Sequence, residues 1–450
     1  MKKQYGFYNY AIKMRLYPNH KQTRILLANI HTSRFIYNQL VANGYTDTRI
    51  RKINTNYPIP KEYYQYNSKH KVIKKSTKRL TGLDRVLANK PEWFDKLPLD
   101  SDMFMNTYVN YQAAWNMFHK VHRAGTPKFK SRARSAWTYT TSNHYNIRQL
   151  AKKDQFPTIY NGSLRFTDRN HLYLGRNLGI IRVNYSQRIK LPSNNKHVRI
   201  SKVTFKYLPS GKWQVSVLLK SKTPFKQPLP TTGKQIGFDL NIENFLVDSN
   251  GRVIANPKFY RQMKKRLAKE QRILSRRQIR AKHAKRKLRD CKNYQKQRRL
   301  VARLHEKIKN QRENFVNVLS TVLIKNHDLI VSENLQSRNM LKNHALAQSI
   351  SDVGWRLFID KLKYKAKLYN RVYILVDPKY TTQRCHNCGY RMGSDKNSHK
   401  LTLDQRAWWC PHCHHCHVLH VRDWNAAINI LEKGWKFYQS QLPIYNVYIQ

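Results

Sequence analysis

Four cysteines near the C-terminus form two Cys-x2-Cys pairs, Cys385 with Cys388 and Cys410 with Cys413. Zinc binds four thiolate or imidazole ligands in a tetrahedron, and each such pair supplies two of them from one tight turn. The 21-residue spacer slightly exceeds the usual length of roughly 15–20 residues, which a flexible loop can absorb. We therefore expect one structural zinc ion on these four thiols, with Cys416 or a nearby histidine as the alternative to Cys413. A filled site of this kind folds its loop and is not catalytic.

Three acidic residues lie in segments that one fold could bring together. Asp239 lies in an apolar strand-like run, Glu333 ends a buried-type strand, and Asp423 begins a predicted helix. Singly, each has an ordinary explanation: a strand acid paired with a cation, a turn residue and a helix N-cap. In a ribonuclease-H-like fold, however, a hairpin strand, a later parallel strand and a following helix converge at one point. Carboxylates there hold two Mg2+ about 3.5–4 Å apart for phosphodiester cleavage.

The elements expected to position these acids follow from periodicity and turn residues. An apolar run reads as a buried strand, an amphipathic stretch reads as a helix, and Ser-Asn-Gly at 249–251 reads as a turn. The predicted strands are 236–242, 245–248, 252–255, 329–332 and 372–376, and the predicted helices lie around 350–370 and at 424–432. This order agrees with that architecture, so we expect all three acids at one site.

The charge balance points to a polyanionic partner. Lys and Arg number 86 against 25 acidic residues, a formal charge of +61 that repels itself without a polyanion. Residues 258–312 alone hold 23 Lys and Arg against three acids, at spacing compatible with long helices. Phosphate contacts of this kind position nucleic acid without reading its sequence. We expect such contacts from Arg272, Arg276, Arg277 and Arg280, and from Lys128, Lys130 and Arg132 in an earlier basic block.

Other features concern the compartment. No apolar run reaches the roughly 18 residues of a membrane span, and the first residues lack the apolar region of a secretion signal. Cysteines that occur as Cys-x2-Cys pairs favour a reducing compartment and a metal over disulfides. We expect no membrane partner and a cytoplasmic, prokaryotic location, associated with the nucleoid when on target.

The N-terminal half alternates between strand and helix patterns. Residues 10–17 read as a half-buried strand, and Pro18-Asn19 opens a helix. A second amphipathic helix begins at Ser101 and stops at Gly125. Residues 126–230 read as antiparallel strands, including a hairpin of 203–207 with 213–219, and end in the Pro-rich linker 224–230.

At these residues the chain resembles the TnpB family, the transposon-encoded RNA-guided DNA nucleases related to type V CRISPR effectors. The resemblance runs nearly end to end, in the family's motif order. Its N-terminal blocks are residues 15–18 (Arg-Leu-Tyr-Pro), 34–38 (Arg-Phe-Ile-Tyr-Asn) and 125–132. The blocks similar to the RuvC motifs are residues 236–240 (Ile-Gly-Phe-Asp-Leu), 331–335 (Val-Ser-Glu-Asn-Leu), 340–343, and the cysteine pairs with 422–427 (Arg-Asp-Trp-Asn-Ala-Ala).

The resemblance implies an α/β multidomain protein. Its N-terminal half would be a β-barrel wedge domain, residues 1–16 and 124–230, with a helical recognition domain, 17–123, inserted in it. Its C-terminal half would be a ribonuclease-H-like RuvC nuclease domain, residues 231–380 and 418–450, with a zinc ribbon, 381–417, inserted in it.

The resemblance also implies roles and partners. Asp239, Glu333 and Asp423 would be the catalytic carboxylates and the ligands of two Mg2+, beside one zinc ion on the four cysteines. Family members hold a guide RNA from the transposon end and check a short motif beside the target. They pair the RNA with one strand of double-stranded DNA, so that base pairing reads the sequence. We expect one protein per guide RNA.

Two alternative functions remain open, and the sequence departs from the family pattern at three positions. A nuclease-inactive RNA-guided repressor would share the fold, although all three acids are present here. A miniature type V CRISPR effector would share the chemistry and differ in genomic neighbourhood. Asn241 stands where the family usually has Gly, Val421 where it usually has an acid, and His414 where Gly is common. Of these, Asn241 could alter the close backbone approach beside Asp239.

Overall fold

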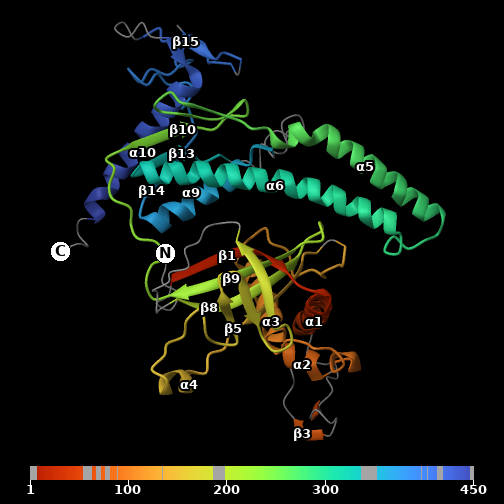
Figure 1. Ribbon diagram of the computed structural model, residues 1–450. Helices are drawn as coiled ribbons and strands as arrows, with labels where there is room; N and C mark the ends of the chain where they lie inside the picture. The colour runs from red at the N-terminus through yellow and green to blue at the C-terminus, as the bar shows by residue number, and fades with distance from the viewer. Residues whose placement is uncertain are drawn as a thin grey trace. The chain divides into compact units, whose positions relative to one another are not determined.

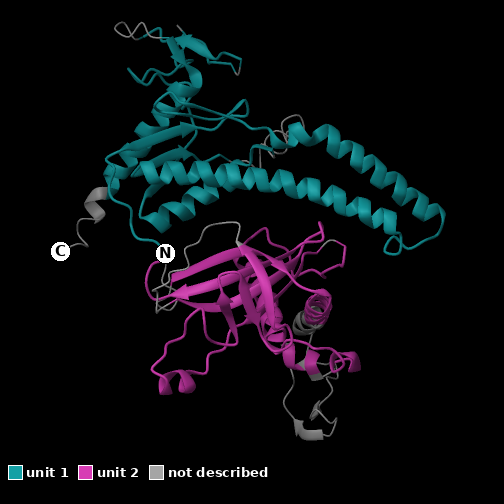
Figure 2. Ribbon diagram, in the orientation of Figure 1, with its two compact units in different colours: residues 1, 226–450 teal, residues 2–225 magenta. Residues whose placement is uncertain are grey.

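The structure consists of two compact units, Lys2–Phe225 and Lys226–Gln450, each with its own hydrophobic core (Figure 2). It is a computed structural model. It describes residues 8–53, 63–66, 72–76, 82–88, 90–133, 135–185, 198–335, 352–396, 398–402, 404–412 and 419–445.

The N-terminal unit is built on a seven-stranded antiparallel sheet, in the order β4-β8-β9-β1-β7-β6-β5. In β1 the side chains of Ile12, Met14 and Leu16 are buried on one face, so the predicted alternation is confirmed. The predicted hairpin is also confirmed, as β8 and β9. The strands are β1 (Tyr8–Tyr17), β4 (Trp137–Ser142), β5 (Leu164–Asp168), β6 (His171–Leu174), β7 (Ile180–Tyr185), β8 (Val198–Tyr207) and β9 (Trp213–Ser221).

Helices of this unit pack on the sheet and on one another. The α1 and α3 helices meet through a buried hydrogen bond between the Ser33 and Thr107 hydroxyls (2.8 Å). The N-cap of α3 is Asp100, whose carboxylate accepts from the Asp102 N–H, so the predicted cap at Ser101 is wrong by one residue. The helix also ends at Lys120, before Gly125. The remaining elements are α1 (His20–Ile53), β2 (Tyr63–Tyr66), β3 (Val72–Ser76), α2 (Gly82–Ala88), η1 (Glu92–Phe94), α3 (Ser101–Lys120) and α4 (Ile147–Lys152).

The C-terminal unit contains a five-stranded mixed sheet in the order β12-β11-β10-β13-β14. The β10, β13 and β14 strands are parallel, while β10, β11 and β12 are joined as antiparallel neighbours. All five residues of the interior strand β13 are buried, which explains its apolar beginning, Leu-Ile-Val. The predicted strands are confirmed, except that the first was predicted to continue to residue 242, with Asp239 in its middle, and instead ends at Asp239. They are β10 (Gln235–Asp239), β11 (Asn244–Asp248), β12 (Val253–Ala255), β13 (Leu329–Glu333) and β14 (Val372–Val376).

Helices cover both faces of this sheet (Figure 1). The α10 helix (Arg422–Tyr445) packs on the face that carries Val331. The α6 helix (Lys292–Asn326) and the α9 helix (Trp355–Tyr369) cover the face that carries Ile330. Two glycines allow α10 to approach closely. A Cβ at Gly237 of β10 would lie 2.6 Å from the Ala427 carbonyl oxygen, and one at Gly434 would lie 2.4 Å from the Val331 methyl groups. This close packing fixes the start of α10 against the sheet.

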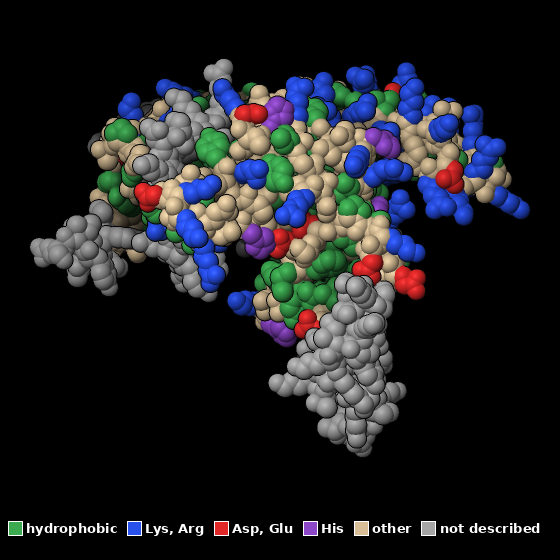
Figure 3. Space-filling model, turned by 60° about the horizontal axis from the view of Figure 1, so that its bottom comes forward, with side chains coloured by type: hydrophobic (Ala, Val, Ile, Leu, Met, Phe, Trp, Pro, Cys, Tyr) green, Lys and Arg blue, Asp and Glu red, His purple; other side chains and the backbone are tan. Residues whose placement is uncertain are grey.

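The basic tract forms a long helical hairpin, confirming the predicted helices. The α5 helix (Phe259–His283) and α6 (Lys292–Asn326) pack through a cluster containing Leu267, Leu304 and Ile308. Their Lys and Arg side chains lie mostly on the outside, and Lys and Arg cover the far end of the hairpin (Figure 3). The apolar seam therefore holds the two helices together although their surfaces have the same charge.

The cysteine-rich segment follows β14 and returns to the sheet at α10. It contains a short antiparallel pair, β15 (Ala407–Trp409) and β16 (Leu419–Val421), directly before α10. Within the described parts of the chain, no helix is both long enough and apolar enough to cross a membrane.

Candidate active site

The three predicted acids meet at one end of the five-stranded sheet. Asp239 is the last residue of β10, and Glu333 is the last residue of the neighbouring parallel strand β13. Parallel neighbours end at the same edge of a sheet, so both carboxylates emerge there. Asp423 is the second residue of α10, whose first turns pack against β10. The helix begins at Arg422, two residues before the predicted start at 424, so Asp423 lies in its first turn and is not its cap.

Asp239 is the most perturbed of the three. Its side chain is buried, and burial raises its pKa well above the usual value. The charges of Glu333 and Asp423 raise the pKa further, against the opposing effect of Arg422. Like charges disfavour ionisation only at short range, so the three carboxylates share one local environment. An ionised Asp239 therefore requires added positive charge.

Glu333 is held by a residue outside the predicted motifs. The Thr381 hydroxyl, in the loop after β14, donates a short hydrogen bond to Glu333 Oε1. Burial raises the pKa of Glu333, while this hydrogen bond and the charge of Lys433 lower it and Asp377 raises it. Thr381 is itself buried, so the orientation of the carboxylate is fixed by the fold.

Asp423 is held by Asn241, one of the three departures from the family pattern. The Asn241 amide donates to Asp423 Oδ2 at 3.0 Å, and its oxygen accepts from the Asn244 N–H at 2.7 Å. Arg406 lies 3.8 Å from the same carboxylate and 3.2 Å from Glu243. Burial raises the pKa of Asp423, whereas Arg406 and Arg422 lower it. Asn241 therefore links the residues after β10 to the start of α10.

The donor set suits hard divalent cations. Carboxylate oxygens are the ligands that Mg2+ prefers, and a cluster of mutually repelling acids gains most from such an ion. The three acids do not form a group whose ligand oxygens all lie within 4.8 Å of one another. Two Mg2+ about 3.5–4 Å apart, each about 2.1 Å from its ligands, join oxygens up to roughly 8 Å apart. Two ions at that separation can therefore be held by carboxylates that do not all reach a single ion.

Three of the four predicted zinc ligands come together. The Cys385, Cys388 and Cys410 sulfurs lie within 4.8 Å of one another, and the last two are 3.6 Å apart. Three thiols at this spacing fit one soft, tetrahedral ion such as zinc. Cys413 and its alternative Cys416 lie outside the described residues. His420 Nε2 lies 3.3 Å from the Cys385 sulfur, a neighbour that the sequence analysis did not identify.

The predicted nucleic-acid contacts fall into two groups. On α5, Arg272, Arg276 and Arg280 are exposed, while Arg277 donates to the Asn293 carbonyl oxygen at 2.7 Å. In the N-terminal unit Lys128 is exposed, whereas two predicted residues also contact aromatic rings. The Lys130 ammonium lies 3.6 Å from the Tyr37 ring centroid, and the Arg132 guanidinium lies 5.6 Å from that of Trp137.

Comparisons with known proteins follow the same segments. Residues 214–344 match a family model described as "Probable transposase", and residues 355–430 match "Cas12f1-like, TNB domain". Residues 8–44 match "Helix-turn-helix domain", although there the structure has one strand and part of one helix. A protein of Escherichia coli K12, provisionally named RNA-guided DNA endonuclease InsQ, is 25% identical over 94% of this chain and 92% of its own. A TnpB-like protein of Methanocaldococcus jannaschii is 33% identical over 22% of this chain and 23% of its own.

In three separate segments the chain is thus similar to family models of transposases and Cas12f1-like proteins, and over most of its length it is similar to the Escherichia coli protein. A Streptomyces pristinaespiralis protein, also provisionally named RNA-guided DNA endonuclease, is 36% identical over 226 residues, half of each chain. A solved Cas12f1–sgRNA–target DNA complex covers 94% of this chain and 99% of that one, at 12% identity and a TM-score of 0.49. The described residues form a multidomain α/β protein, because each of the two compact units combines helices with a β-sheet.

Several residues around the acids were missed by the sequence analysis. Thr381, Arg406 and Lys433 lie outside the motifs that carry the acids and have no spacing signal of their own. Asn241 was noted only as a departure from the family pattern. Its proximity to Asp239 in the sequence was the one clue that it belongs to the site.

Proposed function

We propose that this protein is an RNA-guided DNA endonuclease, encoded by a transposon, which cleaves matched double-stranded DNA by Mg2+-dependent phosphodiester hydrolysis. The observation that carries the proposal is the convergence of Asp239, Glu333 and Asp423 from three elements at one end of the sheet. Names of the curated relatives support the RNA-guided activity. The positive charge of +61 supports polyanionic partners.

In this proposal the C-terminal unit carries a RuvC-type nuclease site with an inserted zinc ribbon, and the N-terminal unit is a wedge with a helical recognition part. Asp239, Glu333 and Asp423 would hold two Mg2+. When bound, such ions activate a water molecule and stabilise the leaving oxygen of the phosphodiester. Thr381 and Asn241 fix two of the carboxylates, so little reorganisation is needed at the reacting phosphate.

The zinc ion would be held by Cys385, Cys388, Cys410 and Cys413, and it would fix the segment between β14 and α10. That segment returns the chain to the start of α10, where Asp423 lies. The guide RNA, from the transposon end, would pair with one DNA strand, while exposed arginines of α5 contact phosphates. The zinc role is thus structural, through the placement of Asp423.

The experiment uses the protein purified with its co-expressed guide RNA and a plasmid that carries a matched target beside a randomised flanking motif. Wild-type protein is expected to cut the plasmid in Mg2+ and not in EDTA, and only when guide and target match. Asp239→Ala should bind the same RNA and the same target without cutting. Binding without cutting by the wild type would instead support an RNA-guided repressor, and cutting by Asp239→Ala would remove that residue from the site.

A further inference from the structure

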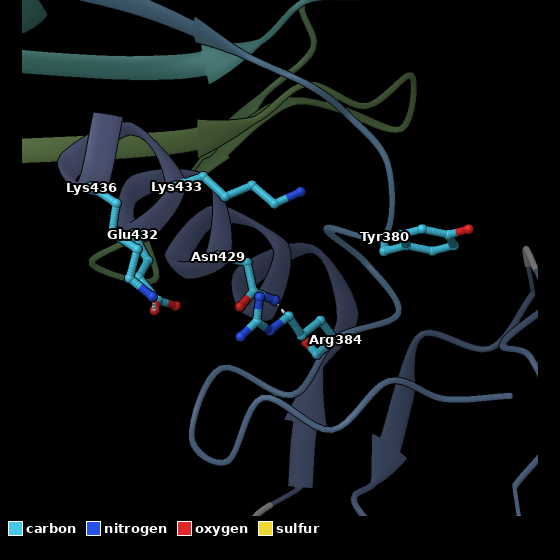
Figure 4. Close-up of a pocket in the computed structure, with 6 residues that line it drawn as sticks. All are labelled: Tyr380, Arg384, Asn429, Glu432, Lys433 and Lys436. Atoms are coloured by element: carbon cyan, nitrogen blue, oxygen red, sulfur yellow. Dashed lines mark hydrogen bonds and ion pairs between the residues drawn. The ribbon is translucent and has the colours of Figure 1, made fainter. Parts of the chain in front are cut away.

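A pocket beside the candidate active site has no role in the proposal so far. It is lined by the loop after β14 and by the outer face of α10 (Figure 4). Its residues are Tyr380, Arg384, Asn429, Glu432, Lys433 and Lys436. The empty space amounts to about 280 Å³ including the open mouth. Because this volume includes open solvent, the enclosed part is well below the ~300 Å³ at which pockets begin to bury a whole small ligand. The pocket therefore suits one group of a larger molecule.

The pocket is joined to the candidate active site by a short chain of hydrogen bonds. The Asn429 amide nitrogen donates to the carbonyl oxygens of Thr381 (2.9 Å) and Arg384 (2.6 Å). The Thr381 hydroxyl in turn donates to Glu333. Lys433 is close enough for its charge to lower the pKa of Glu333. A group seated in the pocket would thus lie directly beside the carboxylate cluster.

The charges in the pocket favour an anion. Its one carboxylate among the described residues, Glu432, is ion-paired with Lys436 at 2.6 Å. Burial lowers the pKa of Lys433, and the charge of Arg384 lowers it further, against the opposite effects of Asp377 and Glu333. Lys433 donates to the Asp377 and Lys379 carbonyl oxygens, which leaves one of its three protons for a ligand. Two mutually repelling cations at one pocket are stabilised by a phosphate between them.

Two further features suit a nucleobase. The Tyr380 ring is half exposed, and the Arg391 guanidinium lies 4.6 Å from its centroid on one side, so the other face is available for stacking. Tyr380 also has a positive φ of 62°, a strained conformation for a bulky residue of the kind that clusters at binding sites. Asn429 is buried, and its side-chain oxygen has no hydrogen-bond partner. A buried acceptor without a partner is costly unless a ligand donor, such as the amino group of a base, satisfies it.

We propose that this pocket binds one nucleotide of the DNA strand being cut, adjacent to the phosphodiester at the three carboxylates. Arg384 and Lys433 hold its phosphate, and Tyr380 stacks on its base. The inference rests on the proposed endonuclease function and specifies how the strand is held there. It predicts that the pocket acts on strand cleavage and not on target pairing.

The first test is cleavage of a synthetic matched duplex by the RNA-bound protein, with target binding measured separately. The double variant Arg384→Gln/Lys433→Gln should cut at least about 10-fold more slowly than the wild type, because each substitution removes a charge-assisted hydrogen bond to the phosphate. Its affinity for the target should stay within about 2-fold of the wild type. Lys363→Gln, an exposed lysine on α9, is the matched control and should cut at the wild-type rate. Equal rates in the double variant and the control would overturn the proposal.

The second test identifies the phosphate and the base. Once the cut position is mapped, single phosphates beside it are replaced by neutral methylphosphonates. One replacement should slow the wild type about 10-fold and have no further effect on the double variant. Tyr380→Leu should slow cutting about 5-fold or more, while Tyr380→Phe, which keeps the ring, should not. If every methylphosphonate slows the wild type and the double variant equally, the proposed nucleotide pocket is refuted. If the wild type never cuts, the proposed endonuclease function is refuted instead.

Discussion

Replacing Asp239 by Asn should stabilise the metal-free protein while abolishing cleavage. Asp239 is only 7% exposed, and its charge is opposed by burial and by two neighbouring carboxylates. Asn has nearly the same shape and no charge, so the folded state no longer carries this repulsion. Substitutions that relieve strain at an active site commonly add about 0.5–2 kcal/mol to the free energy of unfolding.

This gain in the free energy of unfolding corresponds to a higher melting temperature of the C-terminal unit. The C-terminal unit spans residues 226–450. For a domain of that size, 1 kcal/mol changes the melting temperature by roughly 2–4 °C, so Asp239→Asn should melt about 1–8 °C higher in EDTA. The assay is calorimetry of the RNA-bound protein, followed at the transition of this unit. Asp248→Asn is the matched control, because this equally buried carboxylate accepts the Asn250 and Arg252 N–H groups and should not gain stability.

Magnesium should favour the wild type over Asp239→Asn, whereas a rise in pH should widen the advantage of Asp239→Asn in EDTA. Mg2+ at 100 times its dissociation constant adds about 2.7 kcal/mol to a protein that binds it only when folded. Wild type should therefore gain more than Asp239→Asn, while effects of Mg2+ on the RNA are common to both. Because the pKa of Asp239 is raised on folding, the folded state binds protons that the unfolded chain has released. In EDTA, the wild-type melting temperature should thus fall as the pH rises from the ordinary pKa of an aspartate toward the raised pKa of Asp239 in the folded state. The fall should be smaller in Asp239→Asn, which lacks this carboxyl group. Lower stability of Asp239→Asn in EDTA, or equal gains in Mg2+, would refute this reasoning.

Three further outcomes are expected. Glu333→Gln should abolish cutting and leave RNA and target binding intact. Thr381→Val should cut about 10-fold more slowly, because it loses the hydrogen bond that orients Glu333. Equal activity of Thr381→Val and wild type would exclude this orienting role of Thr381. Gly237→Ala should lower the free energy of unfolding, measured by calorimetry, by about 2–3 kcal/mol, because its Cβ would meet the backbone of α10. The control Gly125→Ala, whose Cβ would have its nearest contact at 3.9 Å, should leave this free energy unchanged. Cys388→Ser should lose zinc by mass spectrometry and expose the segment to proteolysis, and unchanged zinc content would contradict its role as a ligand.

The sequence by itself determined which elements form and which side chains are candidates. The apolar run Leu329–Val331 favoured a buried strand because its three side chains are stabilised by leaving water, and the structure buries all five residues of β13. The Cys-x2-Cys spacing similarly required that each pair of thiols share one turn. Local patterns of this kind specify local structure, so the strands and the helical hairpin were predicted correctly, while the catalytic role of the three acids stays a prediction.

Only the tertiary structure decided which distant residues meet. Thr381 reaches Glu333 across 48 positions, and Asn241 reaches Asp423 across 182, because the sheet order and the close packing of α10 bring their segments together. The pocket beside Tyr380 likewise depends on two segments that no periodicity connects. Contacts over such separations arise from chain topology, and single-sequence spacing carries no record of them.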